Sequence, residues 1–139
     1  GLAYNPSTNI LSTTASQAQY ADLAERYQAD AVYNEGHVVV LGGSQEITES
    51  TQENDTHIAG VISERWAYLM NEQEDGPAVA LKGKVMCKVV GSVSKGDVLV
   101  SSSTPGHAVV VDTPNALAIV GRSMVDDADT HPRKIFIKI

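Results

Sequence analysis

The feature that most constrains the fold is an alternation of apolar and polar residues along positions 78–100, AVALKGKVMCKVVGSVSKGDVLV. The alternating sets are Val79, Leu81, Val85, Cys87 and Val89 on one side and Lys82, Lys84 and Lys88 on the other. Successive side chains of a β-strand point to opposite faces, so this period of two predicts one buried face and one basic, solvent-facing one. Gly83 interrupts the pattern and predicts a bend or bulge. We expect the core sheet here.

The same stretch takes part in an internal repeat, which bears on the whole fold. The matching segments are GDVLV at 96–100 with GHVVV at 36–40, and IVGRSM at 119–124 with IAGVIS at 58–63. The glycine-to-glycine spacings, Gly36 to Gly60 and Gly96 to Gly121, differ by one residue. The pattern predicts two similar β units, roughly 32–70 and 89–124. Chance matching in a chain rich in glycine and valine is the alternative.

Short strand signals separated by turn signals continue through the rest of the chain. The segments are Val38–Leu41, Glu46–Thr48, Ile58–Ser63, Trp66–Met70, His107–Val111, Leu117–Met124 and Ile135–Ile139. Many short strands at near-regular spacing are typical of a small β-barrel or sandwich. We therefore predict a mainly β globular domain over residues 16–139.

One segment, Ser16–Tyr27, departs from this strand pattern. Its apolar residues at helical spacing are Tyr20, Leu23, Ala24 and Tyr27. Ser16 with Gln19 three residues later fits a capping box. The spacing predicts one short N-terminal helix, which would place Asp22 and Glu25 on one face as a cap and an ion-pair partner of Arg26 or a lysine. A weaker alternation through Ala21, Leu23 and Glu25 leaves an extended segment as the alternative.

Residues 1–15 are expected to form an N-terminal arm of two extended pieces around the turn signal Asn5–Asn9. The large apolar residues of the arm are Leu2, Tyr4, Ile10 and Leu11. They are too few to build a core alone, so they need a partner surface. We predict that these residues form the interface of a homotrimer.

Composition and charge exclude several classes of partner. The 139 residues carry a formal net charge of −7, which repels phosphate, so no nucleic-acid partner is expected. No apolar run is long enough to cross a bilayer, so no membrane insertion is expected. The single cysteine, Cys87, lies in the apolar phase of its strand and predicts a buried, unreactive thiol.

The charges are unevenly distributed. Between Asp22 and Asp75 the only basic residues are Arg26 and Arg65, whereas lysines cluster between Lys82 and Lys95. Two solvated faces of one barrel would explain this, and so would an acidic surface that meets a basic surface on the next subunit.

Motifs for catalysis or metal binding are missing from the sequence. It holds no phosphate loop, HExxH, paired CxxC or GxSxG pattern. The four histidines are scattered, and the acidic stretch Asp126–His131 reads as a solvated loop. Trp66 and Tyr68 share one face and indicate core or subunit interface, with carbohydrate stacking as the alternative. We predict no catalytic residue, no cofactor and no metal.

The chain resembles the C-terminal domains of tail fibres and other structural proteins of tailed bacteriophages. The segments that carry the resemblance are YADLAERY at 20–27, GHVVV at 36–40, IAGVIS at 58–63, AYLMN at 67–71 and VSKGDVLV at 93–100. The leading YNPSTNILS is similar to β repeats in the body of such fibres. The resemblance implies a virion location and a homotrimeric fibre cap. It also implies contact with other virion proteins and with a receptor on the host surface.

The same resemblance implies kinship with autoproteolytic chaperone modules that carry a DYAE motif and guide fibre trimerisation. Here Leu23 stands where that motif has an aromatic residue, and no cleavage dyad matches residue by residue. A structural role is therefore favoured over an enzymatic one. The alternative is a self-cleaving chaperone module, with Ser12 or Ser16 near the scissile bond.

Overall fold

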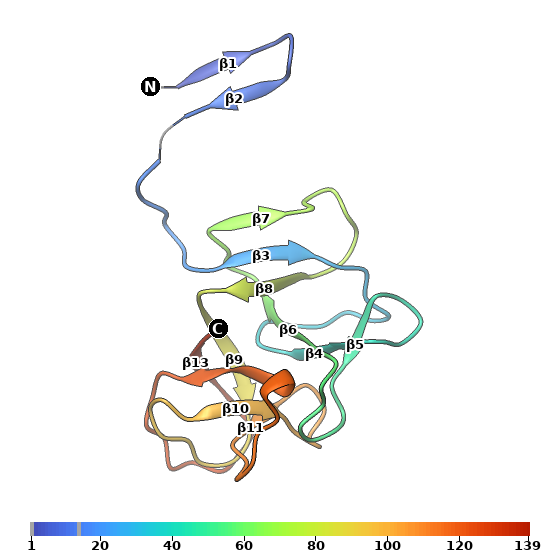
Figure 1. Ribbon diagram of the computed structural model, residues 1–139, viewed down its shortest axis with the longest axis vertical. Helices are drawn as coiled ribbons and strands as arrows, with labels where there is room; N and C mark the ends of the chain where they lie inside the picture. Colours follow the sequence, from blue (N-terminus) through green and yellow to red (C-terminus); the bar gives the residue numbers. More distant parts are fainter. Residues whose placement is uncertain (1, 14) are drawn as a thin grey trace.

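A computed structural model describes residues 2–13 and 15–139 of the chain. It contains three groups of strands that follow one another along the longest axis of the molecule (Figure 1). An N-terminal hairpin comes first, a six-stranded sheet second and a closed five-stranded barrel third. The predicted mainly β fold is confirmed.

The six-stranded sheet has the order β5-β4-β6-β8-β3-β7. Its strands are β3 (Leu23–Arg26), β4 (Val38–Leu41), β5 (Ile47–Glu49), β6 (Ile58–Ser63), β7 (Tyr68–Met70) and β8 (Ala78–Lys82). A parallel bridge between Ala29 and Ile47 joins β5 to the segment that follows β3. The sheet therefore curls back on itself, and we call it the first barrel.

The second barrel is closed in the order β10-β11-β9-β13-β12. Its elements are β9 (Lys84–Val89), β10 (Val98–Ser101), β11 (Ala108–Val109), the 3-10 helix η1 (Ala116–Ala118), β12 (Ile119–Ser123) and β13 (Arg133–Lys138). A parallel pairing between Ala108 and Val89 closes the barrel. Gly83, at a φ of 122°, makes the bend between β8 and β9 that links the two barrels.

The predicted internal repeat is confirmed, and it extends over both barrels. Strands β3, β4, β5, β6 and β8 follow the same spatial order as β9, β10, β11, β12 and β13. Val39 pairs with Gly60 and Leu99 pairs with Gly121, and the register shifts immediately after Val39 and after Leu99. The parallel closure through Ile47 corresponds to the one through Ala108. Chance matching of sequence would not reproduce both irregularities.

The paired glycines of the repeat have a steric reason. A Cβ added to Gly60 would lie 2.9 Å from the Ala80 carbonyl oxygen, and one added to Gly121 would lie 2.6 Å from the Lys138 carbonyl oxygen. Each glycine thus lets a neighbouring strand approach closely at the bulge.

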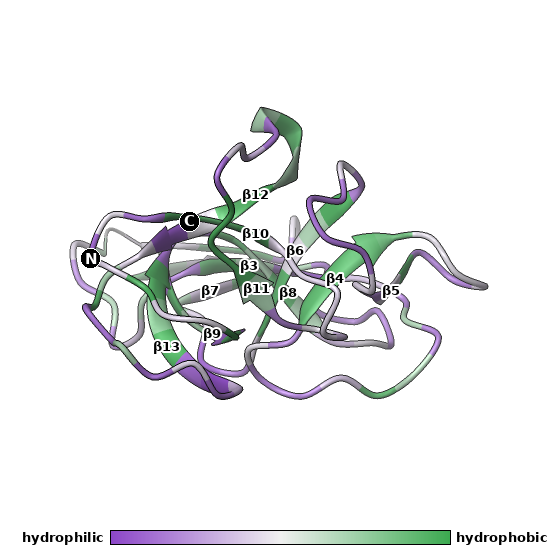
Figure 2. Cartoon of the chain, turned by 90° about the horizontal axis from the view of Figure 1, so that it is seen from below, coloured by the Kyte–Doolittle hydropathy of each residue, from purple (hydrophilic) through white to green (hydrophobic). Residues whose placement is uncertain are grey.

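Two clusters of buried apolar side chains form the core. The larger fills the second barrel and extends to Val38, Val61 and Ala80 of the first. The smaller lies within the first barrel and consists of Val39, Ile47, Ile62 and Val79. Figure 2 shows hydrophobic residues along strands such as β4 and β12 and hydrophilic residues along many connecting loops. Cys87 is fully buried, as its strand phase predicted.

The predicted N-terminal helix is wrong. Leu23–Arg26 forms β3, which pairs with β8 and β7, and residues 15–22 hold no helix. Ala24 is the one fully buried residue of the proposed helical face, whereas Tyr20 is 49 % exposed. The extended alternative holds because pairing with two strands outweighs a weak local helix preference.

The N-terminal arm forms a separate hairpin, β1 (Ala3–Asn5) with β2 (Ile10–Ser12). It stands apart from the barrels at the upper end of Figure 1. Asn9, at a φ of 55°, turns the chain between the strands, as the turn chemistry predicted. Gly1 and Thr14, which the sequence analysis included in this arm, lie outside the described residues.

Candidate functional site

The predicted interface residues all belong to the hairpin. Tyr4 and Leu11 are directly paired across it, and Leu2 lies two residues before Tyr4 on the same face. Ile10 pairs with Asn5 and points to the opposite face. All four apolar side chains are more than half exposed. The hairpin therefore presents apolar surface on both faces, more of it on the Leu11 side.

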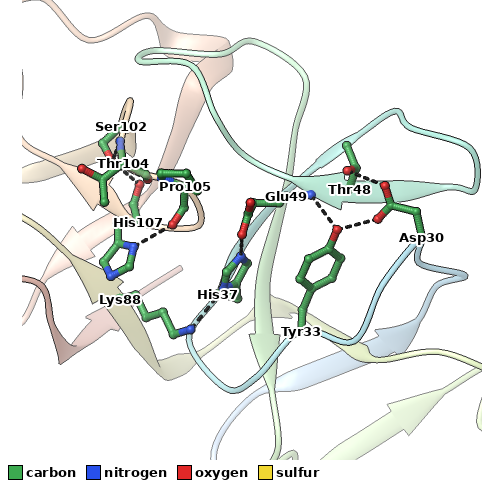
Figure 3. Close-up of polar contacts among 10 residues, drawn as sticks. All are labelled: Asp30, Tyr33, His37, Thr48, Glu49, Lys88, Ser102, Thr104, Pro105 and His107. Carbon is green, nitrogen blue, oxygen red and sulfur yellow. Dashed lines mark hydrogen bonds and ion pairs between the residues drawn. The ribbon is translucent and has the colours of Figure 1, made fainter.

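A polar network centred on His37 lies where the two barrels meet (Figure 3). His37 precedes β4, and its Nε2 lies 2.6 Å from Oε2 of Glu49 on β5. Nζ of Lys88, from β9 of the second barrel, lies 3.1 Å from Nδ1 of the same ring. The Tyr33 ring stacks on the imidazole at 5.0 Å, and a side chain at Gly106 would collide with it. The imidazole is thus held on several sides.

The surroundings of His37 set its protonation. Burial lowers the pKa of His37, the hydrogen bond to Glu49 raises it, and the charge of Lys88 lowers it again. The net shift is downward, so the ring is neutral near pH 7. Nδ1 then accepts a hydrogen bond from the Lys88 ammonium, and Nε2–H donates one to the Glu49 carboxylate.

The network continues to the rim of the first barrel. The Tyr33 hydroxyl donates to Asp30, and the Glu49 amide donates to the Tyr33 oxygen at 3.2 Å. The Thr48 hydroxyl donates to the other Asp30 oxygen at 2.7 Å. The hydrogen bonds from Tyr33 and Thr48 lower the pKa of Asp30. Together with Lys88, His37 and Glu49, these residues form what we call the junction network.

The contacts of the junction network point to a structural role between the barrels. Both imidazole nitrogens of His37 are engaged, and the nearby Ser102 hydroxyl donates to the His107 carbonyl at 2.7 Å. Backbone bonds cross the same junction, including Lys88 N–H to Gly36 O at 2.8 Å and Val38 N–H to Gly106 O at 2.9 Å. The junction network and these backbone bonds therefore connect the two barrels.

Asp22 occupies an unusual position immediately before β3. Its φ is 101°, a conformation that side-chain-bearing residues rarely adopt, and only 7 % of it is exposed. Oδ2 is buried without a hydrogen-bond partner among the described residues. Burial raises the pKa of Asp22, which a hydrogen bond with Ser63 partly offsets. Strained, buried acids of this kind are concentrated at functional sites.

The roles predicted for Asp22 and its neighbours in a helix are corrected with the helix. Asp22 caps no helix, and Glu25 accepts a hydrogen bond from Tyr27 at 3.1 Å. Arg26 bonds to the carbonyls of Glu72 and Gly76 instead of a carboxylate. Its guanidinium also lies 5.4 Å from the centre of the Trp66 ring.

The acidic loop near the C-terminus is held by internal pairs. Asp127 accepts from Arg133 Nε at 2.8 Å, and Asp129 lies 2.8 Å from His131 Nδ1. Within residues 2–13 and 15–139, no group of three metal-ligating side chains comes together. None of the helices in that part of the chain has the length and apolarity needed to cross a membrane.

The lysines of the second half are partly paired within the chain. Lys88 reaches His37 of the first barrel, and Lys134 lies 3.5 Å from Glu35. Part of the uneven charge is therefore balanced by contacts between the two barrels of a single chain.

Two comparisons with known proteins found no match for this chain. No protein-family model matches the chain, and no curated protein matches it either.

Sequence reasoning missed the junction network because its members are far apart along the chain. His37 and Lys88 are separated by 51 residues, and only the docking of the barrels brings them together. One signal was available: His37 stands at the repeat position where the second unit has Asp97.

Proposed function

We propose that this chain is a structural domain of a phage virion, the trimer-forming C-terminal cap of a tail fibre that contacts the host surface. The observation that supports it is the N-terminal hairpin, which exposes Leu2, Tyr4, Ile10 and Leu11 away from both barrels. A two-stranded hairpin is marginally stable alone in water. Association of several copies would bury its apolar faces.

The energetics favour such association. Burying a large apolar side chain contributes about 1.5–3 kcal/mol, so four residues in each of three copies would outweigh the cost of ordering the arm. Cyclic assemblies also use heterologous contacts, in which different surfaces of neighbouring copies meet. The resemblance to fibre domains likewise implies a homotrimer and a location in the virion.

Light scattering on the intact chain tests this proposal. The expected mass is that of a trimer, and a version that starts at Ser16 should be monomeric. Leu11→Glu should also give monomers, because it places charge in the interface. Leu117→Glu is the matched control, since Leu117 is 72 % exposed on η1, far from the hairpin. A monomeric intact chain at micromolar concentration would exclude the trimer.

A self-cleaving chaperone module is the alternative proposal, favoured by Asp22. Its backbone is strained, and one carboxylate oxygen has no hydrogen-bond partner in the described part of the chain. Asp22 lies six residues after Ser16, near the predicted scissile bond. Mass spectrometry of a longer protein should then show two fragments, and Asp22→Asn should leave the chain whole. An uncut chain with Asp22 in place would exclude self-cleavage.

A further inference from the structure

Three hollows adjoin around residues 62–66, at the end of β6. The largest, about 700 Å³, shares Glu64 and Trp66 with the smallest, about 310 Å³. The smallest shares Tyr20 and Arg65 with the third, about 410 Å³, which reaches Phe136 on the second barrel. The three hollows are therefore neighbours, and we call them together the aromatic groove.

Aromatic side chains are concentrated in this groove. Its walls hold the chain's one tryptophan, its one phenylalanine and two of its five tyrosines: Trp66, Phe136, Tyr20 and Tyr33. Tyr20 is 49 % exposed and Phe136 is 44 % exposed. Aromatic surface left open in a concave site is typical of ligand binding.

The Trp66 platform is held in place from one side. The Arg26 guanidinium lies 5.4 Å from the ring centre and is itself fixed by the carbonyls of Glu72 and Gly76. A ring held by such a contact loses little freedom when a ligand stacks on it, so the platform is pre-organised.

Three of the four acids that line the groove make a hydrogen bond or an ion pair within the chain. Glu64 accepts from the Glu35 amide at 3.2 Å, and Glu35 lies 3.5 Å from Lys134. Asp30 accepts from Tyr33 and Thr48, and Asp22 is buried beside Ser63.

Two cations of the groove, in contrast, are unpaired. Arg65 and Lys84 are exposed, line the same 410 Å³ hollow, and make no ion pair with any described residue. Lys84 Nζ lies 5.0 Å from the centre of the Phe136 ring. Although the net charge is −7, this hollow offers a ligand two positive side chains that no described acid pairs with.

We propose that the aromatic groove binds an acidic oligosaccharide. Its carboxylate or sulfate would lie between Arg65 and Lys84, and its sugar rings would stack on Tyr20 and Trp66. The succession of hollows suits several linked rings better than one small molecule. A single-stranded nucleic acid would also stack and carry charge, so tighter binding of a short oligonucleotide than of every acidic sugar would overturn the proposal.

Tryptophan fluorescence tests this directly, because Trp66 is the only tryptophan. The probes are tetragalacturonate, a heparin tetrasaccharide and sialyllactose, with neutral maltotetraose and hexaglutamate for comparison. We expect a saturable change with at least one acidic sugar, at least tenfold weaker binding of maltotetraose, and weaker binding in high salt. No saturable change with any acidic sugar up to millimolar concentration would overturn the proposal. Equal affinity for maltotetraose or tighter binding of hexaglutamate would also overturn it.

Charge variants locate the anion. Arg65→Ala with Lys84→Ala should weaken acidic-sugar binding at least tenfold. Lys95→Ala with Arg122→Ala, which removes the same charges from exposed positions outside the groove, should leave it unchanged. Full affinity in the first double variant would overturn the proposal, and the single Gln variants give the same test if that variant is unfolded. The groove lies within one chain. If light scattering shows that the intact chain is a monomer and this monomer binds the acidic sugar, the trimer is excluded and the present inference is still supported.

Discussion

The two barrels share strand order and register but differ in what fills and surrounds them. The second barrel holds large buried residues such as Leu99 and Ile137 within the larger core cluster. The first barrel has a smaller cluster of its own, edged by the partly buried Tyr27 and Tyr33. One repeat unit is thus built mainly around an apolar core, and the other combines a smaller core with polar contacts.

The surfaces of the two barrels also differ, because the first barrel carries more of the loops and hollows. Between β6 and β8 the first barrel inserts a loop with β7, and this insertion contributes Trp66 and Pro77 to the largest hollow. Asp22, all of the junction network except Lys88, and most residues of the largest hollow also belong to the first barrel. The comparison indicates that the second copy of the duplicated unit contributes most of the shared core, while the first copy holds most of the candidate sites. Stability and function commonly compete within one structure, and two copies separate them.

The largest expected effect comes from the cores. Leu99→Ala in the second barrel and Ile47→Ala in the first should each cost about 2–5 kcal/mol of unfolding free energy. Because the larger cluster includes Val38 and Val61 of the first barrel, we expect one cooperative transition in both variants. Urea unfolding followed by Trp66 fluorescence and by circular dichroism should give coincident curves. Separate transitions would mean that the barrels are independent.

The next largest loss of unfolding free energy is expected at the two equivalent β-bulges. Gly60→Ala and Gly121→Ala should each cost about 1–3 kcal/mol, because the new methyl group meets a carbonyl oxygen of a neighbouring strand. Gly96→Ala is the control: a methyl group there meets nothing within 4 Å, so only its φ of 91° opposes the change. A neutral effect at either bulge, measured by urea unfolding, would contradict the structural repeat.

The junction network should make stability depend on pH. The pKa of His37 is lowered in the folded state, so the unfolded chain binds the proton more readily. Its contribution should be fully present above about pH 6.5 and should fall as pH decreases toward the folded-state pKa. His37→Gln should remove this dependence, whereas the exposed His57→Gln should preserve it. Unfolding midpoints measured between pH 5 and 8 test the prediction.

Asp22 should have a smaller effect of opposite sign. Its folded-state pKa is raised, so ionisation costs stability once the pH exceeds the ordinary value of 3.8. Asp22→Asn should therefore raise the urea midpoint at pH 7, also because asparagine tolerates a positive φ. The gain should vanish toward pH 4. A lower midpoint at pH 7 would show that the carboxylate stabilises the fold.

The smallest expected effect is at Cys87. Burial raises the pKa of the Cys87 thiol to about 12, and the side chain is fully enclosed. A thiol reagent at pH 8 should therefore leave the native chain unmodified and react once urea unfolds it. Mass spectrometry of the native protein gives the result, and rapid labelling would show that the second barrel opens.

The amino-acid sequence by itself determined the local β structure. Alternation located β9 and the burial of Cys87, whereas β8 buries Ala78, Val79 and Ala80 in succession instead of alternating. Apolar runs between turn residues placed β4 and β6 at their observed bounds. Spacing alone also revealed the repeat, because duplicated backbone irregularities require glycine at equivalent places such as Gly60 and Gly121.

Tertiary structure decided the remainder. The segment around Leu23 has a helical spacing, yet it becomes a strand because β7 and β8 supply hydrogen-bond partners far along the chain. His37 meets Lys88 only because the barrels dock, and Tyr20 lines the same hollow as Phe136 only because the first barrel is folded against the second. Local pattern reports which face of a strand is buried, whereas contacts between distant segments depend on the way the strands close into barrels.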